Sequence, residues 1–363
     1  MGKVTIQHVA RHAGVSLGTV SNALNHPEKV RPATLDKVRL AMDELGFMPN
    51  QSARLLAGGH NASFGLILPS LDHGFCLQIA NGAHSEARRN GYGLLIANAD
   101  NDAGLQGDYM RYFMGTQMAG ILVQPFGDGE TARTAAKCPV PVVHLDTHSK
   151  DDGWFVAVDN RMQGALIAEH AVAQGARRIA VVGAEDTTQR SYRALGIREV
   201  QAANPHVSFS FGARGLGSLA RDGYMEGMRL AGLDADARPD FVIALTDVLA
   251  TGVIAGIQDA GASVPDDIAV AGCDGNPLAW SGAVPLTTCA PTGYEVGRRG
   301  VQFLISQIEA RRAAAAGEAA HEPDSNHMSL IRPFLLARQS SAHEASAADG
   351  LAASPASSLS PLV

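Results

Sequence analysis

Apolar and polar positions alternate along most of this chain with two different periods, one typical of helices and one of short buried strands. Residues 5–25 carry apolar side chains at helical spacing on both sides of Gly14, which predicts two short helices joined by a tight turn. Residues 32–45 predict a third helix, because Pro32 stands in its first turn and Gly46 follows its end. The first fifty residues are therefore expected to form a small three-helix domain.

The first two predicted helices have the residue pattern of a helix-turn-helix. Ala10 is small enough for close helix approach, Gly14 suits the left-handed turn, and Val20 seals the pair. Thr5 and Ser16 are the expected N-caps. The same bihelix also occurs in folds that never touch DNA, and the third helix favours the DNA-binding interpretation. The outward positions of the second helix form a short neutral face suited to base edges in a major groove: Leu17, Gly18, Ser21 and Asn22.

From residue 62 onward, short apolar runs alternate with segments of helical length. This alternation predicts an α/β fold with parallel sheets covered by helices on both faces, and it places ligands at the carboxyl ends of the strands. The candidate strands are 64–69, 93–98, 120–124, 140–145, 178–183, 241–246 and 268–272, with a further possible strand at 207–211.

Polar side chains follow several of these strands and are candidates for ligand contacts. Carboxylates and an arginine fork around one aromatic ring suit a polyhydroxylated ligand such as a sugar or a nucleoside, because each can bond adjacent hydroxyls. Any single aspartate at such a position can instead cap the following helix. The candidates are Asp72, Phe75, Asp146, Arg193, Asp247 and Asp274.

Longer sequence motifs support both the DNA-binding interpretation of the first fifty residues and the α/β fold of the rest. Residues 9–25 read VxxxAGVSxxTVSxxLN and residues 45–56 read LGFMPNxxARxL, so that residues 4–59 closely resemble the headpiece and hinge of the LacI family of bacterial transcription regulators. The resemblance continues through FGLILPSLDHGF, AVDNRMQGALIAEHA, VPDDIAVAGCDG and PLTTCAPTGYEVGRRG, which begin at residues 64, 157, 264 and 285.

The resemblance implies a two-lobed, periplasmic-binding-protein-like core at 61–339. The chain would cross between the lobes near Asn160, again at 289–291 and a third time before residue 330, with the effector in the cleft between them. In the family the positions of Arg193 and Asp274 commonly contact the effector. At Asp247 this chain departs from the pattern of the family, which often has Asn before that position where this chain has Thr246.

The resemblance also implies how DNA is bound by a headpiece at 1–48 and a hinge helix at 49–60. The hinge is too short to be stable alone and is expected to fold only against a partner, with Leu56 wedged into the minor groove. The expected DNA-contacting residues are Thr5, Ser16, Leu17, Gly18, Thr19, Ser21, Asn22, Asn25, Arg31, Thr34, Asn50, Arg54 and Leu56.

The net charge of −7 is at first sight wrong for a DNA-binding protein, but the charge is unevenly distributed. Residues 1–60 carry seven Lys or Arg against four Asp or Glu, a net charge of +3, and the remaining residues carry 22 against 32. A basic headpiece on an acidic body confines phosphate affinity to one end. The alternative is a merely uneven solvated surface.

Other chemistries find weaker support. The stretch at 215–220 fits a loose GxGxxA dinucleotide fingerprint, but a simple loop before a helix explains it better, and no cofactor is expected. His8 with His12, and His144 with Asp146 and His148, lack the further ligands that a metal would need, so surface histidines are the better interpretation. No P-loop, GxSxG motif or catalytic dyad is present, so an enzyme is not expected.

Composition and the carboxyl terminus complete the expectations. Four scattered cysteines, no apolar signal core and no membrane-length apolar run predict a cytoplasmic protein. Residues 340–363 are rich in Ala and Ser and are expected to be a disordered tail without heptads, so we expect a homodimer. Two hypotheses remain: an effector-controlled repressor that binds a near-palindromic operator, or a cytoplasmic sugar-binding protein or NAD-dependent enzyme with an incidental helical amino terminus.

Overall fold

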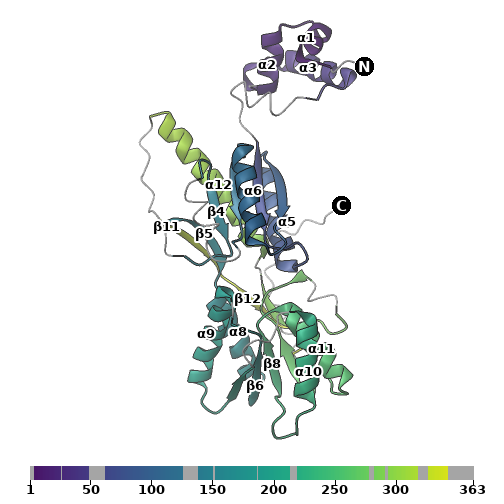
Figure 1. Cartoon of the computed structure of the whole chain (residues 1–363), viewed down its shortest axis with the longest axis vertical. Coiled ribbons are helices and arrows are strands. Elements are labelled where there is room, and N and C mark those ends of the chain that lie inside the picture. Colours follow the sequence, from purple (N-terminus) through teal and green to yellow (C-terminus); the bar gives the residue numbers. More distant parts are fainter. Residues whose placement is uncertain are drawn as a thin grey trace. The chain divides into compact units, whose positions relative to one another are not determined.

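A computed structural model describes most of the chain and groups it into two compact units, Met1–Ala62 and Ser63–Val363 (Figure 1). None of the helices in the described segments is long and apolar enough to cross a membrane. The described residues are 4–25, 27–48, 62–125, 138–149, 152–185, 187–212, 219–277, 282–290, 293–317 and 326–341.

The first unit contains the three predicted helices: α1 (Ile6–Ala13), α2 (Leu17–Asn25) and α3 (Pro32–Leu45), with a short 3-10 helix at Pro27–Lys29. Gly14 and Gly46 end α1 and α3 in the left-handed conformation, with φ of +65° and +62°, as their positions predicted. The three helices bury a small common core formed by Val9, Ala10, Val20, Val38 and Ala41.

Both predicted N-caps are in place. The main-chain N–H of Thr19 donates to Ser16 Oγ at 3.0 Å at the start of α2. Thr5 precedes α1, and its own N–H donates to Nδ1 of His8 at 3.2 Å.

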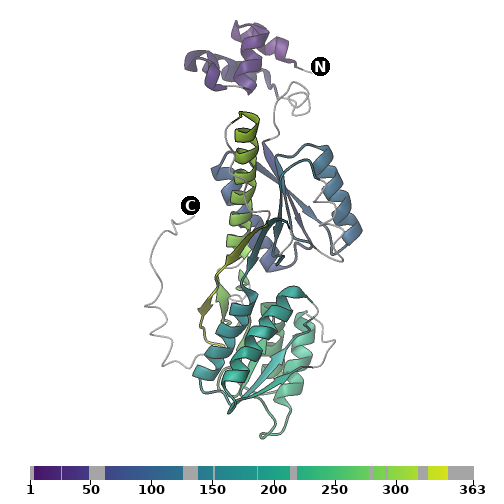
Figure 2. The same cartoon turned by 90° about the vertical axis from the view of Figure 1, so that its left-hand side faces the viewer.

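The second unit begins with an amino-terminal lobe built on a parallel six-stranded sheet of order β11-β5-β4-β3-β1-β2. Helices α5 (Gly74–Arg89) and α12 (Gly293–Ala315) cover one face and α6 (Ala103–Gly115) covers the other (Figure 2). The strands are β1 (Ser63–Leu68), β2 (Gly93–Asn98), β3 (Gly120–Val123), β4 (Val142–Leu145), β5 (Gly153–Val158) and β11 (Asn326–Ile331).

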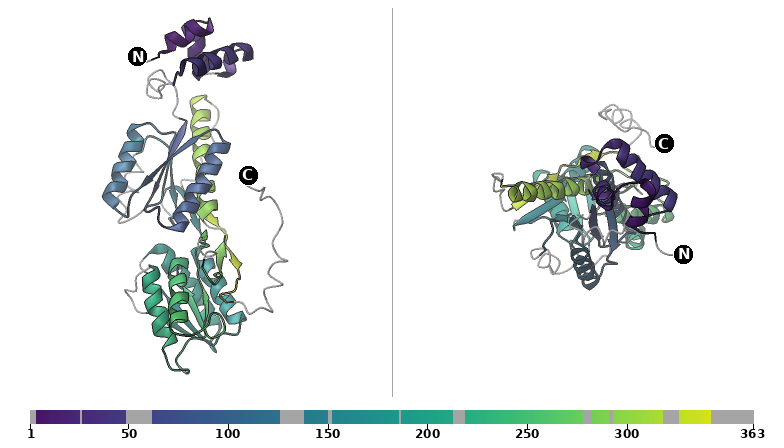
Figure 3. Two further views of the ribbon diagram at one scale, coloured as in Figure 1. Left: turned by 90° about the vertical axis from the view of Figure 1, so that its right-hand side faces the viewer. Right: turned by 90° about the horizontal axis from the view of Figure 1, so that it is seen from above.

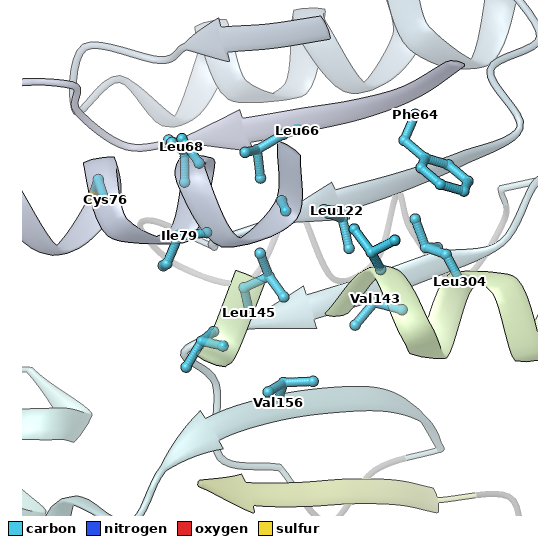
Figure 4. Close-up of a cluster of buried hydrophobic side chains, with 14 of the residues drawn as sticks. Phe64, Leu66, Leu68, Cys76, Ile79, Leu122, Val143, Leu145, Val156 and Leu304 are labelled. Atoms are coloured by element: carbon cyan, nitrogen blue, oxygen red, sulfur yellow. The ribbon is translucent and has the colours of Figure 1, made fainter. Parts of the chain in front are cut away.

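Alternate residues of β1 serve the two faces of this sheet. Phe64, Leu66 and Leu68 pack with α5 and α12 in the cluster drawn in Figure 4, whereas Ile67 packs with Met110 of α6. A strand buried on both faces has to be apolar throughout, which is why its sequence is a continuous apolar run.

The carboxyl-terminal lobe repeats this layered arrangement with a parallel sheet of order β7-β6-β8-β9 (Figure 3). Two separate apolar cores line its faces, one with α8 and α9 and one with α10 and α11. The strands are β6 (Arg178–Val182), β7 (Ser208–Phe211), β8 (Phe241–Ala244) and β9 (Ala269–Ala271), and the helices are α8 (Asn160–Ala173), α9 (Thr188–Ala203), α10 (Ala220–Ala231) and α11 (Asp247–Asp259).

The chain crosses between the lobes three times. The first crossing joins β5 to α8 at Asn160, and the second lies between β10 (Thr288–Ala290) and α12, as expected. The third crossing was expected before residue 330, and this is wrong. It follows Ile331, because β11 stays in the amino-terminal sheet and β12 (Phe334–Leu336) then pairs antiparallel with β10.

The ordered core also extends further than expected. The predicted tail begins at Ser340, but Ser340 and Ser341 are buried, so the boundary lies at least two residues later. Ser340 Oγ donates to the carbonyl of Val270 at 2.6 Å, and Ser341 Oγ lies 2.8 Å from Nε2 of His170. Residues 342–363 lie outside the described segments.

All seven candidate strands are confirmed to within two residues at each end, and the possible strand at 207–211 is β7. The sequence analysis missed β5, β10, β11 and β12. Three of these lie at the crossings between lobes or at a sheet edge, where apolar and polar residues mix.

Candidate functional site

The exposed face of α2 is the candidate nucleic-acid interface of the first unit. Leu17, Gly18 and Asn22 are exposed and Ser21 is half-buried, whereas Val20 on the opposite side is fully buried. The side chain of Leu17 is 47 % exposed, an unusual position for a leucine unless a partner covers it. The structure thus brings the predicted outward residues onto one face.

The other expected DNA contacts have mixed positions. Thr5, Ser16 and Arg31 are exposed at helix starts, and Thr19, Asn25 and Thr34 are half-buried. Asn25 Nδ2 donates to Ser21 Oγ at 3.4 Å. Asn50, Arg54 and Leu56, with the rest of the predicted hinge, lie outside the described residues.

A cavity of about 380 Å³ lies between the lobes of the second unit. The ends of β1, β3 and β4 supply its amino-terminal wall, and the start of α9 with the residues after β8 and β9 supplies the other. Of the six predicted effector-contacting residues, five line this cavity: Asp72, Phe75, Asp146, Arg193 and Asp274.

Arg193 is the best-anchored side chain of the cavity. Its Nη1 donates to Asp274 Oδ1 at 2.5 Å and to the carbonyl of Leu245 at 2.6 Å, and its Nε donates to Asn160 Oδ1 at 2.9 Å. No acceptor among the described residues bonds Nη2, so this nitrogen is the donor left for a ligand. A buried guanidinium fixed on two of its nitrogens is preorganised for such a contact.

Asp247 does not line the cavity, and the expectation that it contacts the effector directly is corrected. Its carboxylate accepts bonds from the main-chain N–H groups of Asp274 and Asn276 at 2.9 and 2.7 Å, and from Thr288 Oγ1 at 2.8 Å. In return, its own N–H donates to Asp274 Oδ2 at 3.0 Å. Asp247 therefore positions Asp274, which in turn holds Arg193.

Asp146 follows β4 and is buried in the cavity wall with a left-handed φ of +52°, which Asp tolerates better than most residues. Its Oδ2 accepts from Gln124 Nε2 at 3.3 Å. Burial raises the pKa of Asp146 to about 7; the positive charge of Arg193 opposes this shift and the negative charge of Asp274 adds to it.

Two glutamines of the cavity wall escaped the sequence analysis. Gln124 follows β3 just as Asp146 follows β4, and position after a strand was the signal that could have identified it. Gln189 lies in the first turn of α9, four residues before Arg193, and its Nε2 donates across the cavity to the main-chain oxygen of Asp146 at 2.6 Å.

The described residues contain no group of three or more His, Cys, Asp or Glu side chains placed to hold a metal ion. His12 contacts Glu44 at 2.6 Å. The expectation that His144 is a surface histidine is wrong, because it is buried and its ring stacks on Phe155. The four cysteines are free thiols. Most of the glycine fingerprint at 215–220 lies outside the described residues.

Comparisons with known proteins match both units. The sequence profile described as "Bacterial regulatory proteins, lacI family" matches residues 5–50, and that of a "Periplasmic binding protein-like domain" matches residues 168–341. Catabolite control protein A of Staphylococcus xylosus is 29 % identical over 313 residues, which cover 84 % of this chain and 92 % of that protein.

A second relative and a solved structure agree with these matches. The ribose operon repressor of Halalkalibacterium halodurans is 28 % identical over 314 residues, covering 84 % of this chain and 90 % of that protein. The crystal structure of the lac repressor dimer bound to operator and the anti-inducer ONPF superposes with a TM-score of 0.77 at 24 % identity, covering 93 % of this chain and 99 % of that chain. This last likeness establishes a shared fold.

Proposed function

We propose that this chain, which belongs to the LacI family of bacterial transcription regulators, is a homodimeric repressor. A small effector would control whether it binds or releases its operator. The observation that carries the DNA-binding part is the exposed face of α2, where Leu17 and Gly18 can meet a thymine methyl and Asn22 can pair with adenine. The other expected DNA-contacting residues, from Thr5 to Leu56, would bind the phosphates and the minor groove. The protein would act in the cytoplasm.

Two exposed apolar surfaces support a homodimer. Strand β2 forms one edge of the amino-terminal sheet and exposes Leu95 and Ile96, and α10 exposes Met225 and Met228. An apolar sheet edge left open to water invites a partner, and a symmetric pair of chains would match a near-palindromic operator.

The cavity between the lobes is the proposed effector site. Arg193 Nη2 and the carboxylates of Asp72, Asp146 and Asp274 can bond neighbouring hydroxyls, while the ring of Phe75 offers an apolar face. The effector is therefore a sugar or a nucleoside-like molecule, and the ribose operon repressor among the relatives agrees with that class.

A gel-shift assay with the DNA upstream of its own gene tests the regulator function directly. We expect binding to a near-palindromic site that resists competition by random DNA, and thermal shift with sugars and nucleosides then finds the effector. A protein that binds a sugar but shifts specific and random DNA equally would be a sugar-binding protein instead.

A further inference from the structure

Some of the charged side chains that line the cavity form ion pairs with one another and others do not. Asp72, Asp146 and Asp274 line it together with Arg190 and Arg193. The guanidinium of Arg193 is committed to Asp274 at 2.5 Å, so its charge is already neutralised by that carboxylate. Arg190 Nε donates to Thr187 Oγ1 at 3.3 Å.

Asp146 is the carboxylate of the cavity that is both buried and outside the ion pair of Arg193 with Asp274. Its side chain is more than nine-tenths buried, and among the described residues no Arg, Lys or His forms an ion pair with it. Gln189 Nε2 donates to the main-chain oxygen of Asp146 at 2.6 Å and its amide also lowers the pKa of the carboxyl, while the bond that Gln124 donates to Oδ2 is long, at 3.3 Å. Two neutral amides, those of Gln124 and Gln189, are thus the side-chain donors that act on the carboxylate of Asp146, and burying a carboxylate with no cation beside it is unfavourable unless another group completes the site.

We propose that the effector of this protein is a polyhydroxylated amine, such as an amino sugar, whose protonated nitrogen is held by the carboxylate of Asp146. This inference rests on the proposed effector site and narrows its ligand class. An ammonium group has three donors and no acceptor, which complements a carboxylate that has spare acceptor positions. The hydroxyls of the same molecule would bond Arg193 Nη2 and Asp274.

The same charges disfavour an anionic effector. A sugar phosphate or a sugar acid would meet three carboxylates against two arginines, of which Arg193 is already paired with Asp274, and like charges at short range oppose binding. A neutral sugar is the serious competitor, because Asp146 in its protonated form can donate to a hydroxyl, and its pKa of about 7 allows that form near neutral pH.

Matched ligands separate these classes. Each amine (D-glucosamine, D-galactosamine and D-mannosamine) is compared by thermal shift and calorimetry at pH 7 with its parent hexose, its N-acetyl derivative and its 6-phosphate, using the intact chain. We expect at least one amine to raise Tm and to bind at least tenfold more tightly than its neutral partners. If no amine exceeds its partners, including the case in which no amine binds, the proposal is overturned.

An Asp146→Asn variant tests the residue itself, since it keeps the shape of the side chain and removes the charge. We expect affinity for the amine to fall at least tenfold, and by a clearly larger factor than affinity for the parent hexose. Asp236→Asn, at an exposed turn of the other lobe, is the matched control and should leave both affinities unchanged. An amine preference that survives in Asp146→Asn rejects the assignment.

Proton linkage provides an independent readout, measured by calorimetry in buffers of different ionisation enthalpy. At pH 7 an ammonium ligand stabilises ionised Asp146 and should release a proton, whereas a neutral ligand that uses protonated Asp146 as donor should take one up. The other ionisable groups facing the cavity are Asp72, His73 and Cys76 of one lobe and Arg190, Arg193 and Asp274 of the other. The linkage assigned to Asp146 is the part that Asp146→Asn abolishes.

Folding and the proposed function are monitored in the same preparations. Removing an unpaired buried charge should not lower the Tm of ligand-free Asp146→Asn, so loss of amine binding without loss of Tm is specific to the site. Gel shifts without ligand should be the same for wild type and Asp236→Asn. Failure of those gel shifts would reject the regulator function, whereas the ligand class is decided by the binding data alone.

Discussion

At the scale of single residues, His144 in β4 makes stability depend on pH. Burial lowers its pKa to about 4, from 6.5 for an exposed histidine, so between these values the unfolded chain binds more protons than the folded one. The stabilisation due to neutral His144 is therefore present above pH 6.5 and is lost as the pH falls toward 4, up to about 3 kcal/mol.

Chemical unfolding of wild type and His144→Phe between pH 7.5 and 4 measures this effect. The variant keeps a ring against Phe155 and should lose less free energy of unfolding on acidification. Asp146 has the opposite sign, because its pKa is raised, but it is present in both proteins and its effect cancels in the difference. Parallel pH profiles would contradict the assignment.

Arg193 has a structural as well as a binding role. Arg193→Ala would leave Asp274 buried without its cation, which costs about 3–5 kcal/mol when one partner of a buried pair is removed. We expect a large loss of stability in urea and no stabilisation by effector. Arg111→Ala, which breaks the exposed pair with Asp108, should change stability by less than about 1 kcal/mol. Equal losses in the two variants would be inconsistent with this view.

The limits of sequence reasoning at this scale are visible in Asp247 and Gln124. Both follow strands, and the sequence favoured the aspartate because its charge suits hydroxyl binding. The structure places Asp247 under the loop of Asp274 and places Gln124 in the cavity wall. Position after a strand predicts the edge on which a side chain lies, whereas its direction depends on the loops of neighbouring strands, which a single sequence does not reveal.

At the scale of elements, glycines allow the close contact of α8 with α9. A Cβ at Gly164 would overlap the carbonyl oxygen of Arg193, so Gly164→Ala has to push the two helices apart. We expect a loss of about 1–3 kcal/mol, typical of overpacking, together with weaker effector binding because Arg193 moves.

Urea unfolding and effector titration measure these two effects. Gly115→Ala at the end of α6 is the matched control, because a Cβ there meets nothing within 4 Å. Alanine is the better helix former, so this variant should be neutral or slightly more stable. A destabilised Gly115→Ala with an unaffected Gly164→Ala would refute the packing argument.

Helix α2 should determine base preference. Asn22 is exposed on its outward face, and asparagine pairs with adenine whereas arginine pairs with guanine. Asn22→Arg should shift selected operators toward guanine at one symmetric position, with a discrimination of about 1–3 kcal/mol. Selection from random DNA measures this, and identical preferred sequences for the two proteins would exclude Asn22 as a base contact.

How accurately the sequence predicts the ends of an element depends on how much of the element is buried and on whether residues that mark helix ends are present. Strand β1 is buried on both faces and α3 has Pro32 and Gly46 as end signals, so the sequence located both within one residue. Strand β11 is an edge strand that exposes Leu330, and β10 and β12 are short strands at a lobe crossing. Their pairing depends on contacts distant in sequence, which local pattern does not contain.

At the scale of the whole molecule, the open edge of β2 should govern dimerisation. Ile96 is 46 % exposed there, and a lysine on an edge strand disfavours pairing with another chain. The Ile96→Lys variant should therefore dissociate to monomers at higher protein concentrations than wild type does, and it should bind operator more weakly. Sedimentation velocity measures this. Leu330→Lys, on the opposite edge of the same sheet, is the control and should remain dimeric; dissociation of the control alone would place the interface elsewhere.

Because the chain passes between the lobes three times, two neighbouring strands of the amino-terminal sheet are synthesised at very different times. Strand β5 is complete at Val158, but its partner β11 starts at Asn326. At about 5–20 residues per second, the roughly 170 intervening residues take about 8–35 s to emerge, and during that time the outer edge of β5 is uncovered. An uncovered strand edge can pair with a neighbouring nascent chain. Slow codons between these two strands would prolong that exposure and lower the yield of soluble protein, although they change no amino acid.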